Sequence, residues 1–591
     1  MIPQVTIYLI LLITLILFLW GRWRYDLVAG MALLAVALSG LITPDQVFLG
    51  FSHPAVITVM AILVLSAGLS NAGVVDRLAN WLSRVEGNHP STQILSLTGV
   101  TGVLSGFIND IGALGLLMPV AIRLVRAAGR SPSTILMPLA FSSILGGLMT
   151  AIGTPPNIYI AAYRAEVTGA PFRLLDFFPV GAPLLVVGIL FIGLVGWRLI
   201  PKREALASQS DLHGIKEYLT EVRVPQGFTG AGKPLQEALA EDGSGVVILG
   251  IVRDGQQLPV PAGEDILEGG DILILEADSS ALTTLLQSTN FELVGKGDVG
   301  EAFLKSKEST LLEVVVLPEA LLVGRNATEL DLRRRYGVNL LAISRQGRQI
   351  VSRLATVRFR PGDVLLLQGA TGSVAQTAVE LGCLQLGGET VRLERPQRTT
   401  LTAAIFVLAV LATALGLLPA AISFSTAAAL MILIGSVTLA EAYASINWPI
   451  IVLLGAMIPV GRAFETTGAA DSLGSLLVQG GAQLPLAGTV GIVLVVSMLL
   501  SNIINKSATT VLMAPVAVSV AQAIGGSPDP FLMAVTVGAS SAFLTPIGHH
   551  CNTLVMGPGG YHFDDYWRMG LPVTILVIVI TLPIIVWMWP V

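Results

Sequence analysis

The chain has 591 residues, and 12% of them are Asp, Glu, Lys or Arg, about half the share usual in soluble domains. Residues 1–200 and 399–591 carry 26 of these charged residues, whereas the 198 residues between them carry 47. This distribution excludes a single soluble enzyme and a uniformly membrane-embedded channel. The net charge of −5 gives no electrostatic reason to expect a nucleic acid partner.

The first block, residues 1–200, contains apolar runs of the length that membrane helices need, about 20 residues. These runs lie near 3–20, 27–42, 54–72, 134–163 and 177–199. The stretch 93–122 is also apolar, but Pro, Gly and Asn lie near its middle. It is therefore either two full spans or a re-entrant hairpin that enters and leaves on one side.

The basic residues predict the orientation, because cytoplasmic loops are enriched in Lys and Arg. Loops next to the apolar runs carry Arg22, Arg24, Arg123, Arg126, Arg130, Arg198, Lys202, Arg203, Arg392, Arg395 and Arg398. If these loops are cytoplasmic, the N- and C-termini lie outside, the middle segment is cytoplasmic and the protein is a multi-pass protein of the inner membrane.

The second block repeats the first at an almost constant offset. Its apolar runs lie near 402–418, 423–440, 448–464, 484–518, 531–556 and 571–589. Pro54, Ser105, Asn109, Gly153 and Asn157 recur 395 or 396 positions later as Pro449, Ser501, Asn505, Gly548 and Asn552. With five crossings in each block the two copies are inverted, an architecture of secondary transporters. A scaffold of two packed copies is the alternative.

The insert has its own repeat, with a period of 92 residues. Ile251, Arg253, Gly270 and Asp271 return as Ile343, Arg345, Gly362 and Asp363. Short β-branched or Leu-rich runs end at Gly-Asp or Asp-Gly turns in both copies, which predicts two small α/β modules. The expected domains are 1–200 and 391–591 for the membrane repeats, and 201–295 and 296–390 for the modules.

Polar interruptions of the apolar runs are the candidate binding site, because non-helical backbone at membrane depth is tolerated only within protein or around a cavity. They lie at residues 105–110 and 153–157 and at the corresponding residues 501–509 and 545–552. Asp110 and Lys506 are isolated charges at equivalent interruptions, which predicts a buried ion pair or a proton-coupled pair. Helix packing contacts and an inert salt bridge are the alternatives.

The adjacent histidines His549 and His550 either titrate near neutral pH or only form hydrogen bonds. Their spacing does not suit zinc. Residues 227–233 fit the pattern G-x4-G-K, but Pro234 stands at the position of the Ser or Thr that would bind magnesium, so we expect no enzyme.

The stretches GGLMTAIGTPPN (146–157) and FLTPIGHHCNTLVMGPGGYHFDDYWRMGLP (543–572) resemble loops of the divalent anion/sodium symporter family, the sodium–sulfate and sodium–dicarboxylate carriers. Residues 219–237 and 332–369 are similar to tandem TrkA-C (RCK C-terminal) domains. The resemblance implies a polytopic α-helical membrane protein of two inverted repeats, each with about five spans plus a re-entrant hairpin. It also implies two α/β cytoplasmic domains inserted between the repeats, and a homodimer with an elevator mechanism.

The family's hairpin motifs give the expected site residues. The ion-binding residues expected from the resemblance are Ser105, Asn109, Asp110, Gly153, Ser501, Asn505 and Gly548. Those expected to bind substrate are Asn109, Asp110, Thr154, Pro155, Asn505, Lys506, Ser507, Thr509, His549 and Asn552. Asp110 and Lys506 replace the Asn of the family motif, and Ile111 replaces its Thr, which makes proton coupling more plausible than two sodium ions.

We therefore expect a secondary active transporter of a small anion, a sulfate-like oxyanion or a dicarboxylate. Sodium or a proton would be the coupling ion, with no other cofactor or metal, and the TrkA-C domains would regulate transport through an unidentified ligand. A TrkA-C-regulated ion channel and a membrane sensor derived from a transporter are the alternatives. No string like the potassium-channel filter TVGYG is present in the sequence.

Overall fold

A computed structural model describes most of the chain. The described residues are 2–20, 23–72, 89–201, 203, 219–238, 247–253, 256–259, 264–276, 285–286, 288–295, 309–318, 320–346, 348–350, 354–370, 373–386, 399–469, 472 and 485–590. The orientation markers Arg22, Lys202, Arg392, Arg395 and Arg398 lie outside them. The chain divides into a helical unit, residues 1–202, 392–555 and 562–591, and a second unit, residues 203–391 and 556–561.

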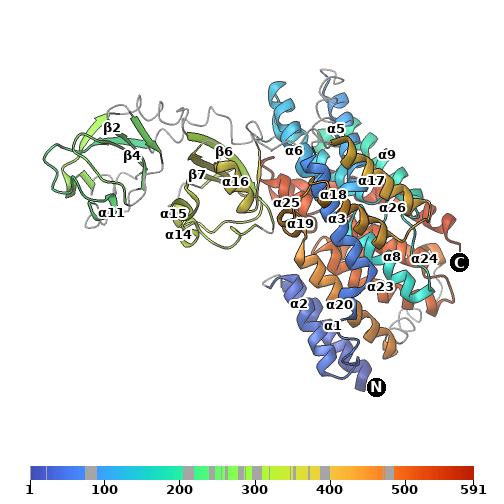
Figure 1. Cartoon of the computed structure of the whole chain (residues 1–591). Helices are drawn as coiled ribbons and strands as arrows, with labels where there is room; N and C mark the ends of the chain where they lie inside the picture. Colours follow the sequence, from blue (N-terminus) through green and yellow to red (C-terminus); the bar gives the residue numbers. More distant parts are fainter. Residues whose placement is uncertain are drawn as a thin grey trace. The chain divides into compact units, whose positions relative to one another are not determined.

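The helical unit contains the apolar runs of both blocks as helices that lie side by side (Figure 1). The first block forms α1 (Ile2–Trp20), α2 (Tyr25–Leu38), the short η1 (Leu49–Ser52), α3 (Pro54–Asn71), α5 (Pro90–Ile108), α6 (Asp110–Ala127), α7 (Leu136–Gly147), α8 (Pro155–Thr168) and α9 (Phe178–Leu194). The second block forms α17 (Thr399–Ala414), α18 (Ala420–Leu433), α19 (Leu439–Ser445), α20 (Trp448–Thr466), α22 (Leu486–Ser501), α23 (Lys506–Ala523), α24 (Asp529–Ser540), α25 (His550–Met556) and α26 (Tyr566–Met588).

Among the described residues, four helices are long and apolar enough to cross a membrane. They are Pro54–Asn71, Pro90–Ile108, Trp448–Thr466 and Phe563–Met588. The pair Asp110–Ala127 and Pro132–Gly147, bent by 119°, is a broken span or a re-entrant loop. Six apolar helices are shorter, so the expected five crossings per block stay a prediction.

The membrane helices form two groups. In the frame group, α1, α2, α3, η1, α17, α18, α19 and α20 pack on one another. In the hairpin group, α5, α6, α7 and α9 pack on one another, and so do α22, α23, α24 and α26. The two sets are joined by α9, which packs on α26, and by α8, which packs on α23 and α24. The frame group meets the hairpin group where α3 packs on α5 and α8 and where α20 packs on α23.

Two of the expected runs are broken helices. The run 134–163 is divided into α7 and α8 by residues 148–154, and the run 531–556 into α24 and α25 by residues 541–549. The first break overlaps the polar interruption expected at residues 153–157, and the second overlaps the one expected at residues 545–552. Thr154-Pro155-Pro156 explains the break, because proline cannot donate an intrahelical hydrogen bond and restricts the residue before it.

Both breaks are held by the same pair of hydrogen bonds. Asn157 Nδ2 donates to the carbonyls of Gly147 (3.1 Å) and Thr150 (2.8 Å). Asn552 Nδ2 donates to the carbonyls of Ala542 (2.8 Å) and Thr545 (3.1 Å), each 395 positions further along the chain. One amide thus satisfies two carbonyls that the interrupted helix leaves free.

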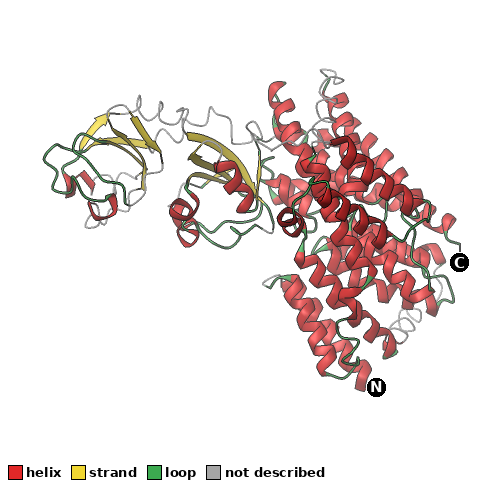
Figure 2. Ribbon diagram, in the orientation of Figure 1, coloured by secondary structure: helices red, strands yellow, loops and turns green. Residues whose placement is uncertain are grey.

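The second unit contains two five-stranded antiparallel sheets with small helices beside them (Figure 2). The first sheet has the order β3-β2-β4-β1-β5 and consists of β1 (Leu219–Arg223), β2 (Val247–Arg253), β3 (Gln256–Pro259), β4 (Ile272–Glu276) and β5 (Glu292–Gly295). The second has the order β10-β6-β9-β7-β8 and consists of β6 (Ser309–Val316), β7 (Val338–Arg345), β8 (Arg348–Gln349), β9 (Val364–Ala370) and β10 (Cys383–Gln385). The order is the same when β1–β5 are matched in turn to β6–β10.

An ion pair between a buried aspartate and a partly exposed arginine recurs in the two sheets at the period of 92 residues. Arg253 Nη2 lies 2.8 Å from Asp271 Oδ2, and Arg345 Nη2 lies 2.7 Å from Asp363 Oδ2. Hydrogen bonding to Asp363 raises the pKa of the Arg345 guanidinium above its ordinary value. The repeated positions seen in the sequence thus have one structural role, and the assignment to TrkA-C domains stays a prediction.

Close glycine contacts set the approach of α5 to α7. A Cβ atom on Gly146 would overlap the backbone of Gly102, so the two helices touch through small residues, as is common in membranes. A Cβ atom on Gly99, which is also on α5, would have no other atom within 4 Å. The close contact fixes the position of α5, which leads into the break at Asn109.

We expect Gly146→Ala to lower the stability by about 1–3 kcal/mol, because the added methyl forces the two helices apart. Gly99→Ala is the matched control and should leave the thermal unfolding temperature unchanged or slightly higher, since Ala favours a helix. Size-exclusion chromatography of heated, detergent-solubilised protein measures both. Equal unfolding temperatures of the two variants would contradict the expected effect of this contact on stability.

Candidate functional site

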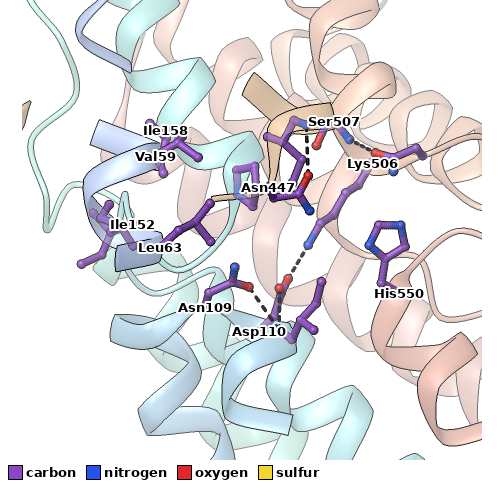
Figure 3. A pocket seen from close by; sticks show the side chains of 15 residues that line it. Val59, Leu63, Asn109, Asp110, Ile152, Ile158, Asn447, Lys506, Ser507 and His550 are labelled. Atoms are coloured by element: carbon purple, nitrogen blue, oxygen red, sulfur yellow. Dashed lines mark hydrogen bonds and ion pairs between the residues drawn. The ribbon is translucent and has the colours of Figure 1, made fainter. Parts of the chain in front are cut away.

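The breaks bring the first residues of four helices to one place. α6 begins at Asp110, α23 at Lys506, α8 at Pro155 and α25 at His550, and these residues line one pocket. Figure 3 shows the side chains of Asp110 and Lys506 reaching toward each other from different ribbons. Helix N-termini carry a partial positive charge, so their convergence favours a bound anion.

An asparagine precedes each of the two hairpin helices and caps it. Asn109 Oδ1 accepts a hydrogen bond from the Ile111 amide (3.1 Å), and Asn505 Oδ1 accepts one from the Ser507 amide (2.8 Å). Asn109 has φ +107°, whereas Asn505 has φ −59°. A non-glycine residue in this region costs about 1–3 kcal/mol, and such strain is concentrated at functional sites.

Lys506 lies at the centre of a buried polar cluster. Its Nζ donates to the carboxylate of Asp110 and to Thr154 Oγ1 (2.9 Å), and it lies 2.9 Å from His549 Nε2. Lys506 is 6% exposed, and Asp110, Thr154 and His549 are each 1% exposed. Removal of one partner from such a pair leaves an unpaired buried charge, which costs about 3–5 kcal/mol.

The hydrogen bonds of His549 assign the proton of its neutral ring. The Cys551 amide donates to His549 Nδ1 (3.2 Å), so Nε2 carries the hydrogen. His549 Nε2 lies 3.1 Å from Asp110 Oδ2 and donates to it. The ammonium of Lys506 and the imidazole therefore share Asp110 as their acceptor.

Three side chains of this region have the donor types of a metal site. A carboxylate oxygen of Asp110, a ring nitrogen of His549 and the sulfur of Cys551 lie within 4.8 Å of one another. Lys506 Nζ, however, donates to Asp110 and lies beside the His549 ring. The ammonium supplies the positive charge there, so these residues do not fit a resident metal ion.

The pocket lies between the two helix groups. The hairpin group contributes most of the polar side chains. The frame group contributes apolar ones from α3, Ile450 from α20 and Asn447, which precedes α20. The lining residues are Val59, Ile62, Leu63, Asn109, Asp110, Ile111, Ile152, Pro155, Ile158, Asn447, Ile450, Asn505, Lys506, Ser507 and His550. Movement of one group against the other would change the access to this pocket.

The site residues expected from the sequence fall into three sets: those that line the pocket, those in the buried cluster beside it, and those that form contacts behind it. Those that line the pocket are Asn109, Asp110, Pro155, Asn505, Lys506 and Ser507. Thr154 and His549 belong to the buried cluster beside them.

The remaining expected residues form contacts behind the pocket. Ser105 Oγ donates to the carbonyl of Ser143 (2.6 Å), and Ser501 Oγ donates to that of Met498 (3.1 Å). A Cβ atom on Gly153 would overlap Gly147, and one on Gly548 would overlap Ser501. Asn552 braces the break after α24, and the hydroxyl of Thr509 is buried without a partner among the described residues.

The sequence did not predict the contribution of the frame group. Val59, Ile62 and Leu63 are ordinary apolar residues of a membrane helix, so they carried no signal. Asn447 did carry a signal, because an asparagine directly before Trp448-Pro449 is typical of a helix N-cap. Its Oδ1 accepts a hydrogen bond from the Ile450 amide (3.2 Å).

Comparison with known proteins gives the family. Residues 15–538 match the model of the citrate transporter family, CitMHS. The chain is 30% identical over 583 residues to an uncharacterized transporter of Synechocystis sp., covering 97% of this chain and 95% of the relative. It is 31% identical to an uncharacterized transporter of Escherichia coli, with 98% of each chain covered.

A more distant relative is sodium/sulfate cotransporter 2 of Chlamydomonas reinhardtii. The two proteins are 26% identical over 55% of this chain and 38% of the relative. With the match to the family model over most of its length, the chain belongs to the citrate transporter (CitMHS) family and is a membrane transporter.

Proposed function

We propose that the protein is a cation-coupled secondary active transporter of a small anion, and that Lys506 binds the anion. The observation that supports this most is an ammonium group buried at a helix break, on the wall of a pocket between two groups of helices. Charged residues within membrane proteins are costly and are typical of substrate and ion pathways.

The anion would take the place that Asp110 holds beside Lys506. The Asp110 carboxylate is bound by Lys506, Thr154 and His549, and these are the donors that a carboxylate or sulfate oxygen needs. Two carboxylates cannot share one ammonium without repulsion. Anion binding therefore requires Asp110 to move away or to be neutralised.

Neutralisation of Asp110 links anion binding to a cation. Either a proton or sodium can balance the carboxylate once Lys506 binds the substrate. A proton needs no further ligands, whereas Ser105, Gly153, Ser501 and Gly548, proposed as sodium ligands, are engaged in contacts within the hairpin group. This favours the proton as the coupling ion.

The substrate class follows from the site and the relatives. The family is named for citrate, and a relative is a sodium/sulfate cotransporter. One ammonium, several helix N-termini and the amides of Asn109 and Asn505 suit a compact dianion or trianion. We propose a sulfate-like oxyanion or a di- or tricarboxylate.

Alternating access would come from an elevator-type movement of the hairpin group against the frame group, in a homodimer. The pocket between these groups supports this proposal, because inverted repeats commonly bind substrate at such an interface. The second unit would act as a cytoplasmic pair of TrkA-C regulatory domains.

Lys506→Ala should weaken anion binding. We expect at least a tenfold loss of affinity, about 1.4 kcal/mol, because the charge-assisted hydrogen bond is removed. Isothermal titration of the purified protein with sulfate, succinate and citrate measures it. Lys233→Ala, which removes an exposed lysine of the second unit, is the control. Unchanged affinity in Lys506→Ala would contradict the assignment.

Asp110→Asn tests the coupling. This variant cannot exchange a proton at the carboxylate, so a pH gradient should no longer drive uptake, while exchange of labelled anion across the membrane should persist. Uptake into proteoliposomes with an imposed pH gradient or an imposed sodium gradient separates the two ions. Normal proton-driven uptake by Asp110→Asn would contradict the role of Asp110.

A further inference from the structure

Three of the helices at the pocket begin with the same kind of cap. Asn109, Asn505 and Asn447 each precede a helix, and the side-chain oxygen of each accepts a hydrogen bond from a backbone amide of the first turn. The cap uses the oxygen of the side-chain amide, so its nitrogen stays available as a donor. Among the described residues, none is a hydrogen-bond partner of these three nitrogens.

The three asparagines line one pocket together with Lys506. Figure 3 shows Asn109, Asn447 and Lys506 around it. The pocket is therefore lined by three amide groups with free N–H donors and by an ammonium group. Carboxylate and sulfate oxygens accept hydrogen bonds from such donors.

Asn447 differs from the other two asparagines because it belongs to the frame group. It precedes α20, whereas Asn109 and Asn505 precede α6 and α23 of the hairpin group. The other described pocket residues of the frame group are apolar, namely Val59, Ile62, Leu63 and Ile450. Among these described residues, the amide of Asn447 is thus the polar side-chain group on the frame side of the pocket.

Close packing holds α20 against the rest of the frame group. A Cβ atom on Gly50, in η1, would overlap the carbonyl oxygen of Gly455, and one on Gly455 would overlap the ring of Phe51. The backbones of η1 and α20 therefore touch. The donor at the N-cap of α20 belongs to a tightly packed part of the frame group.

The cap alone does not explain why an asparagine stands at this position. At the offset of 395, Asn447 corresponds to Ser52, whose hydroxyl donates to the carbonyl of Leu49 (2.9 Å) and which does not line the pocket. Serine and aspartate cap helices about as well as asparagine does. Asparagine adds an amide nitrogen with two N–H donors.

We propose that Asn447 binds the transported anion from the frame group, so that the bound anion bridges the two helix groups. Its Nδ2 donates to the anion while Lys506, on the hairpin group, binds the same anion. This inference rests on the proposed function, because it requires Lys506 to bind an anion. Movement of the hairpin group carries Lys506 away from Asn447. The anion then loses one donor and is bound more weakly after the movement.

Asn447→Gly and Asn447→Asp remove the amide donor and largely keep the cap, since glycine and aspartate are both accepted at an N-cap. Isothermal titration of the purified protein with sulfate, succinate and citrate measures the affinity. We expect Asn447→Gly to weaken binding by about tenfold, the effect of one hydrogen bond to a charged group. Asn447→Asp should weaken binding further, because its carboxylate repels the anion.

An asparagine that only caps α20 predicts a different result. Asn447→Asp would then keep the affinity of the unchanged protein, since a negative charge at a helix N-terminus is favourable. Unchanged affinity in both variants, whatever their unfolding temperatures, would overturn the proposal.

Thr438→Asp is the matched control. Thr438 is the exposed N-cap of α19, another helix of the frame group, and does not line the pocket. The same charge at this N-cap should leave the affinity unchanged. A loss as large as that of Asn447→Asp would overturn the proposal, because any added negative charge in the frame group would then suffice.

The bridge itself is tested by the distance between the helix groups. Spin labels are placed at Leu34→Cys on α2 and Val103→Cys on α5, exposed positions in the frame and hairpin groups. Cys383 is replaced by Ser, and the buried Cys551 is kept. Pulsed electron paramagnetic resonance is recorded without anion and with a saturating concentration of the anion that binds in the titration.

The anion should narrow the distance distribution of the otherwise unchanged protein, because it ties the two groups together. Asn447→Gly, saturated with the same anion, should keep the broader distribution. Equal narrowing in both proteins, or no narrowing in either, would overturn the bridge.

The Lys506→Ala variant separates a failure of this inference from a failure of the proposed function. If Lys506→Ala weakens binding and the Asn447 variants do not, the anion binds to the hairpin group alone and only this inference fails. If none of the three anions binds to the unchanged protein, the proposed function fails and this inference fails with it.

Discussion

The contact between Lys506 and Asp110 is the interaction on which the membrane unit depends. Charges in a medium of low dielectric constant attract each other strongly, but each also loses the hydration that it has in water. The pair is therefore stable only where further polar groups replace that water. Thr154 accepts from Lys506 and His549 donates to Asp110, and both residues belong to helix breaks. The buried charges thus require the interrupted helices around them.

Each helix break also costs free energy, because it leaves carbonyl groups without partners at a depth where water is scarce. At both breaks a side-chain amide, that of Asn157 or Asn552, donates hydrogen bonds to these carbonyls. The two copies then differ in one respect. The Asn157 oxygen accepts from Thr536 Oγ1 (2.6 Å), whereas the Asn552 oxygen is buried without a donor among the described residues. The repeats share a framework and differ in local hydrogen bonding.

The sequence predicted the features that depend on local chemistry. Proline and glycine within apolar runs indicated the breaks. The isolated charges Asp110 and Lys506 indicated two candidate partners, although the sequence did not decide whether they pair, and the structure pairs them. The 92-residue period predicted a repeated module, and Arg253 and Arg345 form equivalent ion pairs. These predictions needed only composition, spacing and the cost of exposing polar groups to lipid.

Features that depend on packing between distant segments could not be predicted from the sequence. The wall formed by α3 consists of Val59, Ile62 and Leu63, which any membrane helix could carry. Asn157 and Asn552 were recognisable as polar residues at a break, but whether they point into the pocket or back to the chain depends on the fold. Tyr163 and Glu465 share a hydrogen bond although they are 302 positions apart, and nothing in their local sequences relates them.

The position of Lys506 has a consequence for how the protein responds to its surroundings. A dissolved cation occupies its site only as far as its concentration and affinity allow, so a site that needs one fails when that ion becomes scarce. An ammonium fixed to α23 is present in every molecule at the same effective concentration. The positive charge that Lys506 brings to the pocket is therefore independent of the ionic composition of the medium, because the chain itself carries it.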